Sequence, residues 1–253
     1  MSGTGASVAT EGRPRLSVVV PVLNERENVG PLVAEIRAAL AGGDSYEIVF
    51  VDDGSDDGTH AALAAVAGPD LRVVRHARRQ GQSAALHTGV RHARADWIAT
   101  LDGDGQNVPG DIPRLLAARD EAGGEAILVV GHRRERRDSG WRRFQSRVAN
   151  GVRATLLGDA TPDTGCGLKV FPRALFLELP FFDHMHRFLP ALFVASDAPV
   201  LSVDVRHRPR LHGRTKYGLH ARLWAGIVDL WGVRWLQSRL RRPSSIESGI
   251  ETE

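Results

Sequence analysis

Acidic residues stand at the ends of two apolar segments of this 253-residue chain. Asp52 and Asp53 end the first segment, and Asp102 and Asp104 follow the second. If both segments are parallel strands, their carboxyl ends meet at one sheet edge, which is where open α/β sheets bind ligands. Carboxylates gathered there repel one another unless a cation lies between them. The pattern therefore predicts a divalent metal ion and a phosphate-bearing substrate at this edge.

The second acidic pair has a spacing that suits one metal ion. Asp102 and Asp104 are separated by one residue, so in an extended or turning segment both carboxylates face the same side. Gly103 and Gly105 allow close backbone approach and unusual dihedral angles. Mg²⁺ or Mn²⁺ prefers such oxygen ligands, completed by phosphate oxygens and water. The alternative is an ordinary Asp-Gly turn, and the position beside the first acidic pair favours the metal site.

In the first acidic pair, we expect either Asp52 or Asp53 to face the cleft. A carboxylate there accepts a hydrogen bond from a base N–H or a ribose hydroxyl. The alternative is a capping role, in which Ser55, Asp56 or Thr59 begins the next helix. The two interpretations are compatible, because the residues after Asp53 can cap while Asp52 binds.

Short β-branched runs alternate with segments of helical spacing over the first half of the chain. Such alternation predicts parallel βαβ units and therefore an α/β fold with a mostly parallel, Rossmann-like sheet. The predicted strands cover 18–22, 48–51, 71–75, 98–101 and 126–130. The predicted helices cover 27–40, 59–67, 82–93 and 112–119. Further on we expect helices over 141–157, 181–193 and 219–240, and strands over 168–171 and 200–205.

Basic residues gather in the second half of the chain. Residues 132–153 hold eight Arg against two acids, and residues 206–242 hold ten Lys or Arg against one acid. This distribution predicts an anionic partner such as a phosphate or an acidic membrane surface. Solvated Arg on helices is the alternative for any single residue. Nucleic acid is not expected, because aromatic residues do not alternate with the basic ones as stacking platforms would.

The single cysteine, Cys166, excludes an internal disulfide and fits a reducing compartment. We expect it to be a packed small side chain. The N-terminal segment lacks the apolar core of a signal peptide. No segment approaches the roughly 18 consecutive apolar residues of a membrane span. The chain is therefore expected to be cytoplasmic, without a transmembrane span.

Three N-terminal motifs together resemble family 2 glycosyltransferases with the GT-A fold: 20–25 (VPVLNE), 51–59 (VDDGSDDGT) and 102–106 (DGDGQ). Downstream motifs resemble the polyprenyl-phosphate branch, which includes dolichol-phosphate mannose synthases: 163–169 (DTGCGLK), 186–190 (HRFLP) and 210–217 (RLHGRTKY). The resemblance implies a GT-A domain over 15–218. Composition and residue pattern predict an amphipathic interfacial helix over 219–242 and disordered ends at 1–14 and 243–253.

The resemblance also implies roles for individual residues. The nucleotide-sugar pocket would include Pro21, Asn24, Glu25, Asp52, Asp53, Asp102, Arg210 and Tyr217. The metal, Mg²⁺ or Mn²⁺, would be held by Asp102, Asp104 and Gln106. The acceptor phosphate and the reaction centre would be served by Arg133, Arg142, Ser146, Asp163 and Lys216. The register in the Arg-rich segment is open, because Arg134, Arg143 and Arg147 compete for the acceptor role.

An inverting transfer of a hexose from GDP-mannose or a UDP-sugar to a polyprenyl phosphate is the activity that the resemblance implies. A phosphate is already ionised at neutral pH, so the attack needs no general base, and Asp163 would orient the acceptor or stabilise positive charge on the sugar. The alternatives are a same-fold enzyme with a soluble or glycan acceptor, and a non-catalytic nucleotide-binding module. The sugar, the base and the oligomeric state stay open.

The last predicted helix has a pattern that suits the cytosolic face of a membrane. Trp224, Trp231 and Trp235 share a side with apolar neighbours, and Arg residues flank them. Such a helix lies in a membrane interface. The alternative is a helix packed on the domain with its Trp side chains in the core.

Overall fold

The computed structural model describes residues 12–123, 126–133, 151, 153–209 and 219–239, with the backbone alone for 219–227. In this part of the chain, seven strands form one sheet in the order β3-β2-β1-β4-β6-β5-β7. They are β1 (Leu16–Val22), β2 (Tyr46–Asp52), β3 (Leu71–Arg75), β4 (Trp97–Thr100), β5 (Leu128–Arg133), β6 (Lys169–Pro172) and β7 (Val200–Val205). β6 runs antiparallel to both of its neighbours, and the other pairings are parallel. The predicted α/β fold with a mostly parallel sheet is confirmed.

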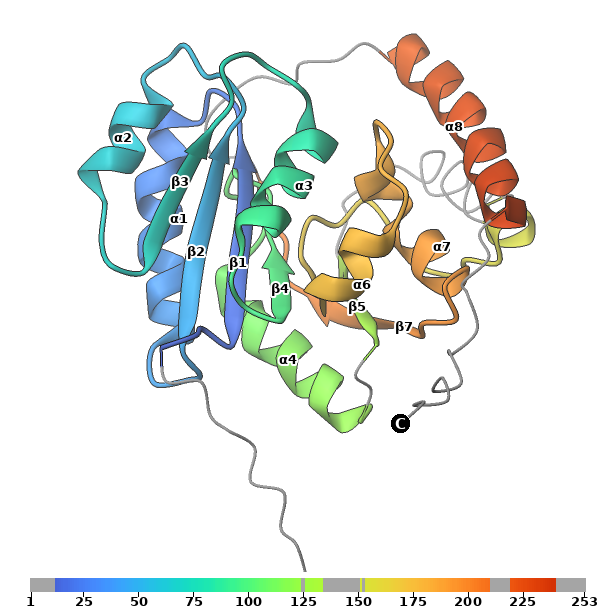
Figure 1. The fold of residues 1–253 in the computed structure, drawn as a ribbon, viewed down its shortest axis with the longest axis horizontal. Coiled ribbons are helices and arrows are strands. Elements are labelled where there is room, and N and C mark those ends of the chain that lie inside the picture. The colour runs from blue at the N-terminus through green and yellow to red at the C-terminus, as the bar shows by residue number, and fades with distance from the viewer. Residues whose placement is uncertain (1–11, 124–125, 134–150, 152, 210–218, 240–253) are drawn as a thin grey trace, which may run out of the picture.

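Helices cover both faces of this sheet (Figure 1). They are α1 (Arg26–Leu40), α2 (Thr59–Ala65), α3 (Gln82–His92), α4 (Ile112–Glu121), α6 (Arg173–Glu178), α7 (Leu189–Val194) and α8 (Leu219–Arg239), with short 3₁₀ turns η1 (Pro109–Asp111) and η2 (Met185–Arg187). Side chains alternate along β1, so Val18 and Val20 pack with α1 and α4, whereas Val19 packs with α3. Burial on both faces explains why the strands are continuous apolar runs.

The helix predicted over 181–193 is wrong in its first half. The chain there forms η2 and becomes α-helical only at Leu189. His184 takes a left-handed φ of 65°, which stops a continuous helix, and Pro190 stands at the start of α7. The apolar character of the segment reflects burial of Met185 and Phe188 rather than helical periodicity. The short helix α6 was not predicted.

Helix α8 packs on the domain through one side and presents apolar side chains on the other. Val233 is 1% exposed, and Gln237 donates hydrogen bonds to the carbonyls of Leu157 and Ala191. Trp231 and Trp235, one turn apart, are 65% and 61% exposed. The alternative that placed these two Trp side chains in the core is therefore wrong, and Trp224 lies among the residues described by backbone alone. In the described helices, none is long and apolar enough to cross a bilayer.

Candidate functional site

The carboxyl edge of the sheet brings the predicted site residues together. β1, β2, β4 and β5 run in one direction, so the segments that follow them begin at this edge. These segments carry Asn24, Asp53 and Asp102, while Arg133 closes β5. β6 runs the opposite way, so its first residue, Lys169, lies at the same edge. The loop before β6 therefore carries Asp163 into the site.

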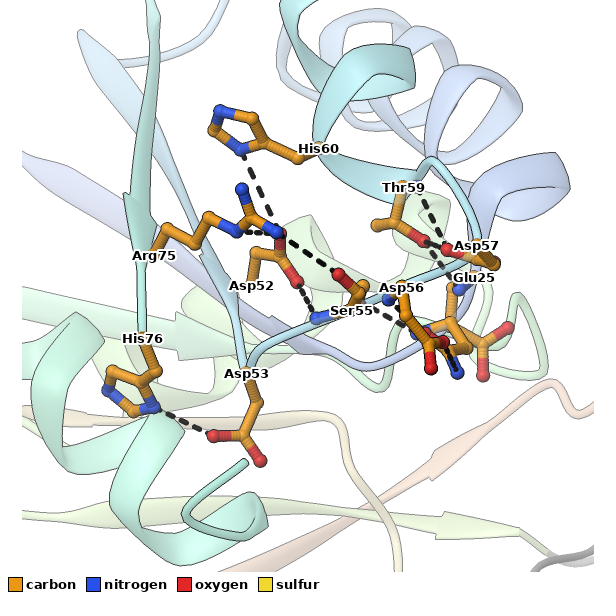
Figure 2. A network of polar contacts seen from close by, with 11 residues as sticks. Glu25, Asp52, Asp53, Ser55, Asp56, Asp57, Thr59, His60, Arg75 and His76 are labelled. Carbon is orange, nitrogen blue, oxygen red and sulfur yellow. Dashed lines mark hydrogen bonds and ion pairs between the residues drawn. The ribbon is translucent and has the colours of Figure 1, made fainter. Parts of the chain in front are cut away.

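Asp52 is a buried carboxylate whose two oxygens have different partners within the protein (Figure 2). Its Oδ1 accepts a hydrogen bond of 2.9 Å from the N–H of Ser55. Its Oδ2 lies 3.3 Å from Arg75 Nε and 3.8 Å from His60 Nδ1, yet no described residue donates a hydrogen bond to it. A buried acceptor without a donor is costly, and the guanidinium of Arg75 offsets part of this cost through its charge.

Asp53 makes its contacts within the protein. Its carboxylate accepts 2.8 Å hydrogen bonds from the N–H groups of Gln80 and Gly81, and its Oδ1 lies 2.7 Å from His76 Nδ1 (Figure 2). These bonds fix the loop that leads into α3. The first residue of α3, Gln82, donates a 3.0 Å hydrogen bond from its side chain to Asp102 Oδ1. Asp53 thus connects the two acidic motifs, and its predicted contact with the nucleotide stays a prediction.

The loops after β1 and β2 are joined by polar contacts. Asn24 has a left-handed φ of 57°, and its amide side chain pairs in both directions with Asp56. The N–H groups of Asn24 and Glu25 donate to the side chains of Ser55 and Thr59. The predicted capping role of Ser55, Asp56 or Thr59 is wrong, because α2 begins after Gly58 with no side-chain cap. These residues instead hold the neighbouring loop. Pro21 lies in β1, just before this loop. β1 pairs with β4 only as far as Val19, so the N–H that Pro21 lacks removes no hydrogen bond from the β1–β4 pairing.

The second acidic motif lies closely against the end of β1. A Cβ on Gly103 would lie 2.4 Å from Val22 Cγ1, and Gly105 has a φ of 73°. The two expected roles of these glycines, close approach and unusual dihedral angle, are both confirmed. The N–H of Asp102 donates to Asn107 Oδ1 at 3.0 Å, and Asp104 Oδ1 accepts the N–H of Gln106 at 3.1 Å.

The charges at this motif suit a divalent cation. Burial raises the pKa of Asp102, and the nearby Asp104 carboxylate raises it further, while Lys169 and Arg133 oppose the shift. Two carboxylates that destabilise one another are a set of hard oxygen ligands. Among the described residues, no three or more His, Cys, Asp or Glu side chains form a complete metal cluster. A cation bound here therefore needs further oxygens from Gln106, water or a substrate phosphate.

Arg133 and Asp163 form a bidentate ion pair at the other side of the site. Arg133 Nε and Nη2 donate to the two carboxylate oxygens at 2.7 and 2.8 Å, and both side chains are almost buried. Burial opposes the charge of Arg133, but the hydrogen bonds and the charge of Asp163 outweigh it and raise the guanidinium pKa. The pair fixes the direction of Arg133.

Two residues of the site were not predicted as such. Lys169 is buried, and its Nζ donates to the carbonyl of Cys166, while burial lowers its pKa. Lys169 is one of only two lysines in the chain, and this rarity is the sequence feature that could have marked it as a site residue. His186 Nδ1 lies 2.7 Å from Ser83 Oγ in α3, and burial, with the charge of Lys169, lowers its pKa to about 3. Cys166 is a buried thiol, as predicted.

Five predicted site residues lie outside the described residues: Arg142, Ser146, Arg210, Lys216 and Tyr217. Their roles stay predictions.

Comparison with known proteins decides the family. The profile of glycosyl transferase family 2 matches residues 17–179. The chain belongs to this family. A dodecaprenyl-phosphate galacturonate synthase from Rhizobium johnstonii is 37% identical over 236 residues, which are 90% of this chain and 69% of the relative. An undecaprenyl-phosphate 4-deoxy-4-formamido-L-arabinose transferase from Edwardsiella ictaluri is 36% identical over 208 residues, which are 81% of this chain. The alignment spans only 63% of that relative's length.

Solved structures confirm the GT-A fold. Mannosyl-3-phosphoglycerate synthase from Rubrobacter xylanophilus superposes with a TM-score of 0.67 at 18% identity, covering 93% of this chain and 79% of that one. Glucosyl-3-phosphoglycerate synthase from Mycobacterium tuberculosis, solved with Mn²⁺ and UDP, gives 0.65 at 20% identity, covering 91% and 82%. The predicted family and its polyprenyl-phosphate branch are confirmed by the curated relatives.

The neutral state of His186 predicts a pH dependence of stability. The pKa of His186 is about 3 in the fold, whereas an unfolded chain protonates His near about 6.5. The contribution of His186 to the free energy of unfolding is fully present above about pH 6.5. It declines as the pH falls toward 3, because only the unfolded chain takes up the proton. The loss is about 2 kcal/mol by pH 5. His186→Asn keeps a hydrogen-bonding side chain without a titrating one, so urea unfolding at pH 8 and pH 5 should show a smaller difference than in the wild type. An unchanged difference would contradict the assignment.

Proposed function

We propose that this protein transfers a hexose from a nucleotide sugar to a polyprenyl phosphate, with inversion at the anomeric carbon. The observation that supports this most is that three groups lie at one sheet edge: the Asp52 carboxylate, the Asp102–Asp104 pair and the Arg133–Asp163 pair. The curated relatives named above act on dodecaprenyl and undecaprenyl phosphate. Each of the three groups matches one part of such a reaction.

The donor nucleotide is assigned to the first motif. Asp52 Oδ2 accepts from the base or the ribose, beside Arg75 and His60. The cross-linked loops around Asn24 and Glu25 hold the pocket wall before the donor arrives. Such preorganisation reduces the ordering cost of binding. Pro21 and Asp53 remain assigned to this pocket.

A divalent ion is assigned to Asp102 and Asp104, with Gln106 beside them. When bound, Mg²⁺ or Mn²⁺ neutralises charge that develops on the diphosphate leaving group. The residues themselves fit this role because their mutual repulsion is relieved by a cation. Gln82 orients Asp102 through its 3.0 Å hydrogen bond.

The acceptor phosphate is assigned to Arg133. An acceptor oxygen attacks the anomeric carbon while the bond from that carbon to the diphosphate oxygen breaks, so the nucleoside diphosphate leaves with the electron pair. The acceptor is already anionic, and no base has to remove a proton. Asp163 binds Arg133 at both carboxylate oxygens, so it is assigned to holding the guanidinium in place for the acceptor.

Helix α8 is assigned to the membrane surface, on the cytosolic face. A polyprenyl phosphate is presented from a bilayer, and the exposed side of α8 holds Val228, Trp231 and Trp235. Arg234 is exposed next to them, and the Arg239 guanidinium lies 5.9 Å from the Trp235 ring. Trp at the headgroup level with flanking Arg is the pattern of a helix in an anionic interface. The opposite side, with Val233 and Gln237, keeps the helix on the domain.

The reaction is tested with a panel of GDP- and UDP-sugars, a short polyprenyl phosphate and Mn²⁺. We expect one donor to be transferred, with inverted configuration in the product, and EDTA to abolish turnover. Asp102→Asn should lower kcat/KM by about 100-fold or more, because a metal supplies several kcal/mol of charge stabilisation. Transfer to a soluble sugar but to no lipid phosphate would overturn the acceptor assignment. Binding of nucleotide without transfer of any sugar would favour a non-catalytic module.

Asp163→Asn tests the link between the ion pair and the acceptor. It leaves Arg133 charged and buried, so we expect a loss of about 3 kcal/mol in unfolding free energy and a raised KM for the lipid phosphate. The matched control is Glu47→Gln. Glu47 is also buried and accepts a 2.9 Å hydrogen bond from Nε of the half-exposed Arg94, but it stands at the start of β2, at the opposite sheet edge. The control should lose stability with an unchanged acceptor KM. Near-normal turnover and KM in Asp163→Asn would dismiss the role.

Vesicle flotation tests the membrane assignment. The Trp231→Ser/Trp235→Ser variant should bind vesicles that contain phosphatidylglycerol at least about tenfold more weakly than the wild type, since each lost Trp removes more than about 1 kcal/mol of apolar burial. Leu201→Ser, at an exposed apolar residue of β7, serves as the control and should float normally. Equal flotation of the Trp variant and the wild type would place the membrane contact elsewhere.

A further inference from the structure

The segment that leaves β7 runs along the second acidic motif. The N–H and Nε of Arg206 donate to the carboxylate of Asp111 at 2.7 and 3.0 Å. His207 forms an antiparallel bridge with Asn107, and the N–H of Arg208 donates to the carbonyl of Gln106 at 3.2 Å. Three consecutive residues of this segment therefore contact the chain between Gln106 and Asp111. They lie about a hundred residues away in sequence.

The side chain of Arg208 joins the motif to helix α1. Its Nε donates to the carbonyl of Gly105, and its Nη2 donates to Glu35 Oε2 at 2.7 Å. Glu35 belongs to α1, which packs in the core of the domain. The guanidinium thus ties the Gly105 carbonyl to a rigid element. A lysine has a single ammonium on a flexible stem and does not reproduce this planar arrangement.

One peptide unit receives both the Arg208 contact and an Asp104 contact. The carbonyl of Gly105 and the N–H of Gln106 belong to the same planar group. Arg208 binds the carbonyl, and Asp104 Oδ1 accepts the N–H at 3.1 Å. Gly105 has a φ of 73°, a backbone conformation that glycine adopts without steric strain, so contacts rather than a side chain must fix this peptide. The direction of this peptide sets one of the hydrogen bonds that hold the Asp104 carboxylate.

We propose that Arg208 is a positioning residue that sets the Asp104 carboxylate for metal binding by holding the Gly105–Gln106 peptide against α1. The proposal rests on the proposed function, because it concerns the metal-binding motif of the donor site. Arg208 itself does not contact the metal or the substrate in this role. Partners that orient metal ligands typically change metal affinity by about 10- to 100-fold when they are removed.

Direct Mn²⁺ binding to Arg208→Lys tests the proposal. Free Mn²⁺ is measured by its EPR signal in the presence of UDP and, separately, GDP, with no sugar donor present. We expect the Kd for Mn²⁺ to rise by about tenfold or more. In turnover assays, the lost kcat should return as Mn²⁺ is raised to saturation. A general loss of packing would not be rescued by the metal.

Arg173→Lys is the matched control. Arg173 also binds two backbone carbonyls, those of Val90 and Arg91 at 2.9 and 3.1 Å, but at the end of α3 away from the site. This variant should keep the wild-type Kd for Mn²⁺. Glu35→Ala is a second test that leaves Arg208 in place. It should raise the Kd in the same direction, by a smaller factor, and its half-exposed site allows the fold to form.

The outcomes separate the two proposals. If the wild type binds Mn²⁺ and both Arg208→Lys and Glu35→Ala bind it equally well, the positioning role is overturned and the metal site stands. If the wild type itself binds no Mn²⁺ with either nucleotide, the proposed metal-dependent donor site is overturned, and the role of Arg208 with it. A raised Kd in Arg173→Lys of the same size would also overturn the positioning role.

Discussion

The burial of Asp102 beside a second carboxylate, Asp104, is the main electrostatic constraint on this site. Burial raises the pKa of Asp102, and the charge of Asp104 adds to the effect. The protein offsets part of this cost with Lys169, Arg133 and the Gln82 amide. What remains uncompensated favours a cation. Burial lowers the pKa of Lys169, because its ammonium loses hydration, although the charge of Asp102 opposes this shift.

Within each acidic motif, neighbouring residues have different tasks. Asp52 keeps an oxygen free of hydrogen bonds from the described residues, whereas Asp53 accepts two backbone N–H groups of the loop before α3. Asp102 is oriented by Gln82, and its N–H is held by Asn107. Each acidic motif of this family 2 glycosyltransferase therefore also has a structural task. Part of each motif holds the loops that keep the ligands in place.

The polar contacts of the site also reach the periphery of the domain. The 180–187 region joins α3 through His186 and Ser83, and His184 Nδ1 lies 2.9 Å from Asp229 of α8. The helix with the exposed Trp side chains therefore contacts the segment that borders the reaction centre.

The sequence by itself determined the alternating α/β order, the strand ends that carry the acidic motifs, and a long helix over the Trp-containing segment of α8. These properties are local, since strand and helix periodicities report which side chains are buried. Only the tertiary structure decided that β6 inserts antiparallel between β4 and β5, which brings Lys169 and Asp163 to the edge. It also decided the contacts of His186 with Ser83 and of Arg208 with Gly105, each spanning 103 residues. Strand order and such distant contacts depend on how elements pack against one another, and no local periodicity encodes that choice.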